Sequence, residues 1–253
     1  MPFLQHKVAI VTGGGQGVGR GIALALAREG AAVMLAGRTR ATLAKVQTEI
    51  TALGGTADIA VADVKSAAEI TKTVADTAAR FGGIDILINN AQEVPLGKLL
   101  DVDDEAFLAG FASGPLATFR FMKACHAHFV ARGGGAVVNL ATAASERWDM
   151  SGYGAYAAVK QAIRALSRAG AGEWGRDNIR VNTIAPHAMS PGMEMWIQMR
   201  PEEAAAFIAT IPLGRVGDCE ADIGRVVAFL CGPDASYLSG AIIPVDGGQA
   251  NFG

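Results

Sequence analysis

Cysteine, charged residues and long apolar runs are all scarce in this chain of 253 residues. Its three cysteines, Cys125, Cys219 and Cys231, are far apart and set among apolar neighbours, which favours reduced core thiols over disulfides and predicts no metal site. No segment approaches the roughly 18 apolar residues that span a bilayer, and the amino-terminal residues lack the pattern of a secretory signal. These absences predict a cytoplasmic protein with no membrane partner.

Charge of either sign is also in short supply. Lys and Arg number 22 against 24 Asp and Glu, the formal net charge is −2, and the basic residues are scattered, so no nucleic-acid partner is expected. Hydrophobic residues make up 51% of the chain and charged residues 18%, a composition that excludes a disordered protein. The sequence is unusually rich in glycine, with 32 residues, which must lie where only glycine fits.

Short apolar segments alternate with segments of helical periodicity along the whole chain. The expected strands are 7–12, 32–36, 56–61, 84–89, 135–140, 180–184 and 241–245, and the expected helices are 19–30, 42–53, 66–81, 103–132, 156–174 and 218–230. Strands that are solidly apolar belong to a parallel sheet covered by helices on both faces. The sequence therefore predicts an α/β fold, a Rossmann-type doubly wound sheet of seven parallel strands in three α/β/α layers, built as a single dinucleotide-binding domain over residues 1–253.

One long stretch, at about residues 187–213, stands outside this alternation. It begins just after the sixth expected strand, and open α/β sheets bind ligands at the carboxyl ends of their strands. We expect this insertion to cover a substrate site.

The first strand leads into a glycine-rich turn, Thr12-Gly13-Gly14-Gly15-Gln16-Gly17-Val18-Gly19, which opens a helix. A pyrophosphate can approach closely only where side chains are absent, and the amino terminus of a helix offers N–H groups and partial positive charge. The turn predicts a dinucleotide site that includes Gly13, Gly15, Gln16, Gly17, Val18 and Gly19.

The end of the second strand carries Arg38 where NAD-binding proteins usually place an acid for the ribose 2′-hydroxyl. An arginine pairs with a 2′-phosphate through charge-assisted hydrogen bonds, so NADP(H) is favoured as cofactor and NAD(H) is the alternative. The glycine turn has Gln16 where a second basic residue would strengthen this interpretation.

Tyr156 and Lys160 lie four residues apart at the start of an expected helix and so share one face. A phenol with a pKa of about 10 is a poor acid-base group at neutral pH, and a nearby ammonium lowers that pKa. This tyrosine could then exchange a proton with a carbonyl oxygen.

Taken together, these motifs make the chain resemble the short-chain dehydrogenase/reductase family, in its short single-domain branch, from about residue 7 to 248. The resemblance rests on the glycine turn and on Ala62-Asp63-Val64, Asn89-Asn90-Ala91, Tyr156-Ala-Ala-Val-Lys160, Arg180-Val-Asn-Thr-Ile-Ala-Pro186 and Val245-Asp246-Gly247-Gly248. It implies that Asp63 bonds the adenine amino group beside Val64, that Asn90 and Ala91 border the adenosine ribose, and that Pro186, His187 and Met189 border the nicotinamide. It also implies Tyr156 as general acid-base, Lys160 as the partner that holds the nicotinamide ribose and lowers the tyrosine pKa, and a homotetramer.

Several positions depart from the family pattern. Gln92 replaces a glycine, His187 replaces another, and the asparagine of the fourth helix is missing from the Ala112-Ser113-Gly114 region. The catalytic serine of the family aligns with Thr142, which we favour because it keeps a hydroxyl, or with Ala143 by strict counting from Tyr156, or with Ser145.

These departures leave three functions open. The first is an NADP(H)-dependent enzyme that interconverts a ketone and a secondary alcohol. The second is an enoyl-thioester reductase that uses Tyr153, seven residues before Lys160; the third is a non-catalytic cofactor-binding scaffold or sensor.

The insertion is rich in soft apolar side chains, with Met189, Met193, Trp196 and Met199 at helical spacing. We expect a substrate pocket formed by Gln92, Ser145, Trp148, Met193 and Trp196, with Met150 on the same wall. The sequence has no cluster of basic residues that would bind an anionic substrate. We therefore expect the substrate to be a hydrophobic small molecule, cyclic or steroid-like.

Overall fold

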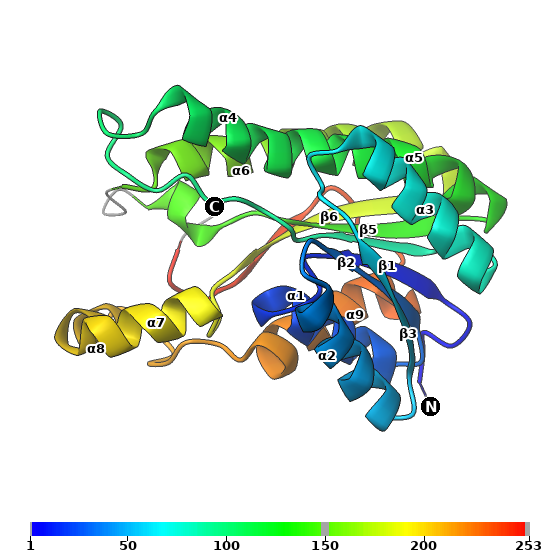
Figure 1. The fold of residues 1–253 in the computed structure, drawn as a ribbon, viewed down its shortest axis with the longest axis horizontal. Coiled ribbons are helices and arrows are strands. Elements are labelled where there is room, and N and C mark those ends of the chain that lie inside the picture. Colours follow the sequence, from blue (N-terminus) through cyan, green and yellow to red (C-terminus); the bar gives the residue numbers. More distant parts are fainter. Residues whose placement is uncertain (1, 148–151, 251–253) are drawn as a thin grey trace.

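Seven parallel strands form the centre of the computed structural model, which describes residues 2–147 and 152–250. In chain order they are β1 (Val8–Thr12), β2 (Ala32–Gly37), β3 (Thr56–Val61), β4 (Ile86–Asn89), β5 (Gly135–Leu140), β6 (Ile179–Pro186) and β7 (Ile242–Val245). They lie in the order β3-β2-β1-β4-β5-β6-β7, so the direction of winding reverses between β1 and β4 (Figure 1). The carboxyl ends of these strands form one edge of the sheet, where ligands bind in doubly wound folds.

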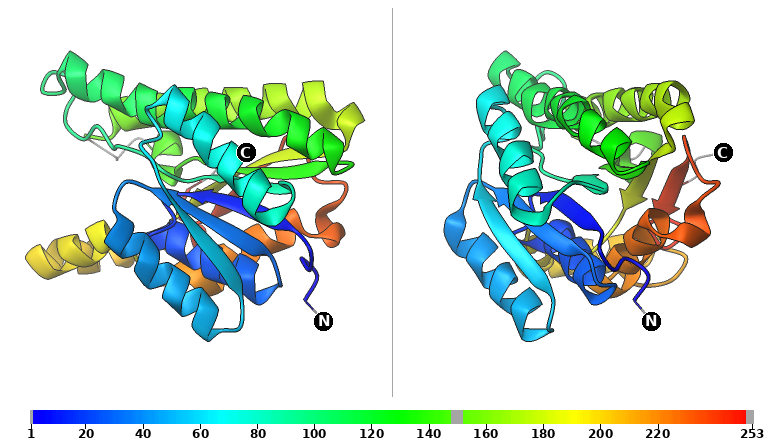
Figure 2. Two further views of the ribbon diagram at one scale, coloured as in Figure 1. Left: turned by 45° about the vertical axis from the view of Figure 1, so that its right-hand side comes forward. Right: turned by 90° about the vertical axis from the view of Figure 1, so that its right-hand side faces the viewer.

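Helices cover both faces of the sheet, as Figures 1 and 2 show. One face carries α1 (Gly17–Arg28), α2 (Arg40–Ala52) and α9 (Arg225–Cys231), and the other carries α3 (Ala67–Phe81), α4 (Asp104–Phe111), α5 (Ala117–Ala131) and α6 (Gly154–Trp174). The prediction of a seven-stranded, three-layer α/β/α fold is confirmed.

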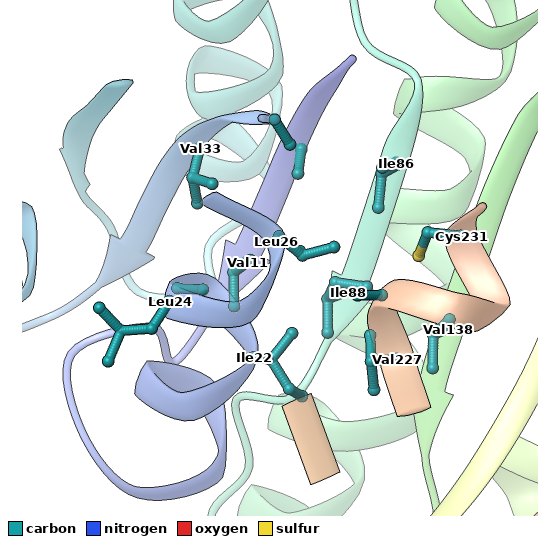
Figure 3. Close-up of a cluster of buried hydrophobic side chains, with 14 of the residues drawn as sticks. Val11, Ile22, Leu24, Leu26, Val33, Ile86, Ile88, Val138, Val227 and Cys231 are labelled. Atoms are coloured by element: carbon teal, nitrogen blue, oxygen red, sulfur yellow. The ribbon is translucent and has the colours of Figure 1, made fainter. Parts of the chain in front are cut away.

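Two buried apolar clusters, one on each face, hold the layers together. In the first, Ile22 and Leu26 of α1 pack with Val11 and Ile88 of the sheet and with Val227 of α9 (Figure 3). The second joins side chains of the sheet, α3 and α5, and includes Ile70, Val74, Phe121 and Phe129. The solidly apolar strands of the sequence are thus explained, because side chains of both orientations are buried.

The three cysteines belong to this interior, as the sequence predicted. All are free thiols within buried surroundings, and burial raises the pKa of Cys219 to about 11 and that of Cys231 to about 12. Burial also raises the pKa of the Cys125 thiol. A thiol with a raised pKa is almost fully protonated at neutral pH and is therefore a poor nucleophile.

Polar side chains begin several of the helices. Ser66, Asp103 and Ser190 accept hydrogen bonds from the N–H groups of the residues three positions on, at the starts of α3, α4 and the insertion helix. Such caps satisfy N–H groups that have no partner within the helix.

One helix of the sequence prediction is interrupted. The segment expected as a single helix over 103–132 is α4 and α5 joined by a wide turn at Ala112–Leu116 that contains Pro115. Proline has no N–H and its ring clashes with the carbonyl four residues earlier, so the hydrogen-bond pattern widens there. The helix expected at 218–230 likewise opens with a wide turn, Cys219–Gly224, before α9.

The insertion forms two helices, α7 (Pro191–Met199) and α8 (Pro201–Ile208), which extend away from the sheet (Figure 1). The expected methionine stripe is only partly correct. Met189 precedes α7, and Met199 is 73% exposed, whereas Met193 and Trp196 are half-buried. The helix begins later than the spacing suggested because Ser190 and Pro191 form its start.

Among the described helices, none has the length and apolar character to cross a bilayer.

Candidate active site

The glycine turn between β1 and α1 lies at the point where the winding of the sheet reverses. Gly13 and Gly17 have φ of +66° and +52°, a region that side chains rarely adopt. A Cβ on Gly13 would lie 2.6 Å from Asn90 Nδ2, and one on Gly19 would lie 2.5 Å from the same atom. The turn therefore requires glycine, and it presents the first N–H groups of α1 at the sheet edge.

Asn90 ties the glycine turn to the end of β4. Its side chain donates to Thr12 O at 2.9 Å and Gly13 O at 3.3 Å. The Thr12 hydroxyl in turn accepts from the backbone N–H groups of Asn90 and Ala91 at 2.9 and 3.0 Å. Two of the predicted cofactor residues, Asn90 and Ala91, thus lie against the predicted pyrophosphate turn.

Charged side chains gather where β2, β3 and β4 end. Arg38 Nη1 lies 2.9 Å from Glu93 Oε1, and Lys65 Nζ lies 3.0 Å from the same oxygen. Asp63, just before the buried Val64, accepts from Lys65 N through Oδ1 at 2.9 Å. Arg38 is therefore ion-paired, and Lys65 and Glu93 are two neighbours that the sequence reading did not single out.

Tyr156 and Thr142 meet at the start of α6. The Thr142 side chain interacts with that of Tyr156 and lowers the pKa of the tyrosine. The Thr142 hydroxyl also accepts from Ala144 N at 3.2 Å, which fixes its rotamer. Ser145 instead directs its Oγ to Thr142 O at 2.9 Å and to Glu146 Oε1 at 3.2 Å. Of the hydroxyl positions considered from the sequence, Thr142 is the one that acts on the pKa of the tyrosine.

Lys160 lies one turn along α6 from Tyr156 and is 3% exposed. Its Nζ donates to Leu140 O at 2.7 Å and is 5.5 Å from the centroid of the Tyr156 ring. Burial lowers the pKa of Lys160 to about 7.

The pKa of Tyr156 moves opposite to our expectation. Burial raises it to about 12; the hydrogen bond from Thr142 lowers it and the nearby Tyr153 raises it. A lysine whose own pKa is lowered by burial carries less charge at neutral pH and so stabilises a phenolate less than a fully charged one. Depression of the tyrosine pKa therefore needs something that restores charge to Lys160.

Tyr153 stands immediately before α6, with its ring centroid 6.3 Å from that of Tyr156 in an edge-on arrangement. The contact of 5.5 Å with Lys160 Nζ is that of the Tyr156 ring, and Thr142 also interacts with Tyr156.

Gln92 occupies space inside the wide turn of the α4–α5 region. Its Nε2 donates to Glu93 O at 2.7 Å and to Gly110 O at 3.0 Å, while its Oε1 has no hydrogen-bond partner within residues 2–147 and 152–250. A Cβ on Gly114 would lie 2.5 Å from that oxygen. The glutamine that replaces the family glycine is thus accommodated by a glycine in the turn, and Ser113 binds Glu93 N at 3.0 Å there.

The end of β6 brings Pro186 and His187 to the same edge. His187 N donates to Val245 O at 3.0 Å, and its ring lies 5.4 Å from that of Phe207, which in turn meets Trp196 at 5.5 Å, both edge-on. Burial lowers the pKa of His187, and neither ring nitrogen has a partner among the described residues.

Other predicted positions complete this edge. Met189 pairs through its backbone with Gly217, and its carbonyl accepts from the Cys219 thiol. The predicted pocket residue Trp148, with Met150, lies outside the described residues. The aromatic contact from Phe207 was missed, because nothing in the sequence relates α8 to His187.

A glycine turn at the reversal point of a doubly wound sheet, with a tyrosine-lysine pair at the same edge, defines the class of nicotinamide-dependent oxidoreductases. The comparisons with known proteins name the family: the chain belongs to the short-chain dehydrogenases/reductases. The family model that matches residues 13–250 is described as enoyl-(acyl carrier protein) reductase.

The similar proteins span nearly the whole chain. A 12α-hydroxysteroid dehydrogenase of a Clostridium species is 39% identical, covering 98% of each chain. A galactitol 2-dehydrogenase of Cereibacter sphaeroides is 35% identical, over 97% of this chain and 95% of its own. Among solved structures, a 7α-hydroxysteroid dehydrogenase in complex with NADH and 7-oxoglycochenodeoxycholic acid has a TM-score of 0.92 and 31% identity, over 98% of this chain and 95% of its own.

The relatives decide between the three functions left open by the sequence. They are dehydrogenases of hydroxyl groups, which confirms the prediction of an enzyme that acts on CH–OH or C=O with a nicotinamide cofactor. This interpretation is favoured over an enoyl-thioester reductase and over a non-catalytic scaffold.

Proposed function

We propose that the protein interconverts a hydrophobic ketone and its secondary alcohol, with Tyr156 exchanging the proton with the substrate oxygen. The observation that carries this is the proximity of the Thr142 and Tyr156 hydroxyl groups, whose interaction lowers the tyrosine pKa, with Lys160 one helical turn away. A hydroxyl pair of this kind can hold a carbonyl oxygen from two sides. The bound nicotinamide supplies the hydride at its C4.

The geometry of the sheet edge fits such a cofactor. The glycine turn leaves no room for side chains and offers helix N–H groups to a pyrophosphate. In this proposal the pyrophosphate is held by Gly13, Gly15, Gln16, Gly17, Val18 and Gly19, the adenosine by Asp63, Val64, Asn90 and Ala91, and the nicotinamide half by Pro186, His187, Met189, Tyr156 and Lys160.

The proposed cofactor is NADP(H) rather than NAD(H). Arg38 and Lys65 supply two cations at the end of β2 and β3, which supports binding of a 2′-phosphate. Equal affinity for the two oxidised cofactors in a titration would contradict this preference.

The proposed substrate is apolar and ring-shaped, such as a steroid. The half-buried Met193 and Trp196, with Phe207 packed on Trp196, provide soft and aromatic surface near the end of β6. The other described residues of the predicted pocket, Ser145 and Gln92, donate hydrogen bonds to Thr142 O and Gly110 O. Because one relative is a polyol dehydrogenase, the substrate screen must include both classes.

A homotetramer in the cytoplasm is the proposed state. A groove of about 560 Å³ on the α4–α5–α6 face is lined by Leu108, Phe111, Ala112, Pro115, Leu116, Phe119 and Leu166. Leu108 is 64% exposed and Phe119 is 42% exposed, and exposed apolar patches of this kind mark interfaces. Sedimentation equilibrium measures the mass directly, and a monomer at micromolar concentration would refute the proposal.

The decisive experiment compares Tyr156→Phe with Tyr153→Phe. Turnover of steroid ketones with NADPH should fall at least 1,000-fold in the first variant, by loss of proton transfer, and remain within a few-fold of the wild type in the second. Cofactor affinity, measured by quenching of protein fluorescence, should be nearly unchanged in both. Retained turnover in Tyr156→Phe would refute the assigned role, and activity restricted to small polyols would refute the hydrophobic substrate.

A further inference from the structure

The three charged side chains at the ends of β2, β3 and β4 form one cluster, which we call the adenosine-edge triad: Arg38, Lys65 and Glu93. Both cations contact the same carboxylate oxygen, at 2.9 and 3.0 Å. Arg38 is 63% exposed, Lys65 35% and Glu93 30%, so the acid is the least exposed of the three side chains.

The position of the triad in the fold is unusual because β1 lies between β2 and β4. Arg38 and Lys65 follow neighbouring strands on one side of β1, whereas Glu93 follows β4 on the other side. The ion pairs therefore connect the two sides of the strand that carries the glycine turn.

Hydrogen bonds fix the backbone from which the Glu93 side chain extends. Ser113 Oγ accepts from Glu93 N at 3.0 Å, and Gln92 Nε2 donates to Glu93 O at 2.7 Å. On the opposite side, Arg120 donates to Lys65 O at 2.9 Å. The backbones of Glu93 and Lys65 are thus both hydrogen-bonded to side chains of the α4–α5 region, which limits the motion of the segments that carry the ion pair.

We propose that Glu93 occupies the place of the cofactor's 2′-phosphate and thereby limits the preference for NADP(H) over NAD(H). The proposal rests on the proposed cofactor site. Arg38 and Lys65 carry two positive charges, and Glu93 neutralises one of them. A 2′-phosphate must displace the carboxylate from both cations and remains close to it afterwards, whereas a 2′-hydroxyl makes neither demand.

The same cluster assigns Lys65 as the second cation for the phosphate. The glycine turn has Gln16 where a basic residue would serve, and Lys65 approaches from the turn after β3 instead. A charge at this position acts on the 2′-phosphate without contacting the nicotinamide half.

The test uses adenosine fragments, which carry no nicotinamide and so cannot react. Binding of adenosine 2′,5′-bisphosphate and of ADP is measured by calorimetry for the wild type, Glu93→Gln and Asp76→Asn. The last variant is the matched control, since it removes one negative charge and one lysine ion pair on α3 without touching the triad.

Glu93→Gln should bind the 2′,5′-bisphosphate about fivefold more tightly and ADP within twofold of the wild type, because only the phosphate competes with the carboxylate. Asp76→Asn should match the wild type for both fragments. Lys65→Gln should weaken the bisphosphate about fivefold and leave ADP unchanged.

Unchanged or weaker bisphosphate binding in Glu93→Gln overturns the proposal, as does an equal gain for ADP. Glu93→Asp, whose shorter side chain withdraws the carboxylate from the cations, should act in the same direction and covers the case that Glu93→Gln does not fold. Failure of both fragments to bind the wild type would overturn this proposal together with the cofactor site. An inactive substrate screen with intact fragment discrimination would overturn only the proposed reaction.

Discussion

Replacement of the buried Lys160 by methionine should stabilise the cofactor-free protein. The lysine is 3% exposed, its Nζ has Leu140 O as acceptor, and burial lowers its pKa to about 7. Below pH 7 the folded chain must therefore hold a buried ammonium, which disfavours folding. Methionine has similar length and no charge.

The size of the effect follows from the pKa. Lowering it from 10.5 to about 7 is worth on the order of 5 kcal/mol, at about 1.4 kcal/mol for each pKa unit. The variant loses the hydrogen bond to Leu140 O and leaves that carbonyl unpaired, at a cost of about 2 kcal/mol. Lys160→Met should thus gain about 3 kcal/mol at pH 6.

The sign of the pH dependence is fixed by proton counts. Between pH 7 and about 10 the unfolded chain keeps its lysine proton while the folded chain has released it, so the unfolded state binds more protons and stability rises with pH. The advantage of Lys160→Met should shrink by about 1.4 kcal/mol per pH unit above pH 7 and reverse near pH 9 or 10.

Urea unfolding at pH 6, 7, 8 and 9 measures this directly, without cofactor. The difference between variant and wild type cancels other titrating groups, including the buried thiols. Lys45→Met, at an exposed position on α2, serves as control and should give a difference independent of pH. A Lys160→Met variant that is less stable than the wild type at pH 6 would refute this account of the buried lysine. So would a difference in unfolding free energy that stays constant from pH 6 to 9, because the pKa of the buried amine would then not be lowered.

Substitutions at three further positions probe the turn, the sheet and the tyrosine partner. Gly19→Ala places a Cβ against Gly13 O and should destabilise the protein by about 2 kcal/mol, measured by urea unfolding; a variant with wild-type stability and cofactor affinity would contradict the close packing of the turn. Asp85→Asn should cost about 2 kcal/mol, because the buried carboxylate accepts two hydrogen bonds from Arg132 at 3.1 Å; a urea midpoint equal to that of the wild type would argue against an ionic contribution. Thr142→Ser should keep turnover within about tenfold of the wild type while Thr142→Val loses about 100-fold, and equal rates in steady-state assays would remove the hydroxyl from the mechanism.

Much of the fold could be read from local pattern. The strands Thr56–Val61 and Gly135–Leu140 have the predicted bounds, because a pair of glycines directly precedes each run and marks where it begins. The long helix over 103–132 was less predictable. Pro115 sits in its middle, and whether proline ends, kinks or widens a helix depends on which neighbours satisfy the freed carbonyls.

The site was predictable only where function depends on spacing along one element. The glycine turn and the Tyr156–Lys160 pair are local and were found. The triad joins residues from three different turns. Each member taken alone looks like an ordinary charged residue at the surface, so the sequence does not predict their contact. The raised pKa of Tyr156 likewise follows from its burial by residues that are distant in the sequence. The sequence indicates only that a lysine is nearby.

The buried cysteines give the protein three built-in reporters of its own opening. Cys125 lies in α5, Cys231 at the end of α9, and Cys219 in the wide turn before it, so they sample both faces of the sheet. A maleimide reagent can modify each thiol only when its surroundings separate, and the labelling rate at each site then reports a local opening equilibrium. Mass spectrometry of partly labelled protein would rank the two helical layers by stability. Repeating the labelling with cofactor would show which layer is stabilised by cofactor binding.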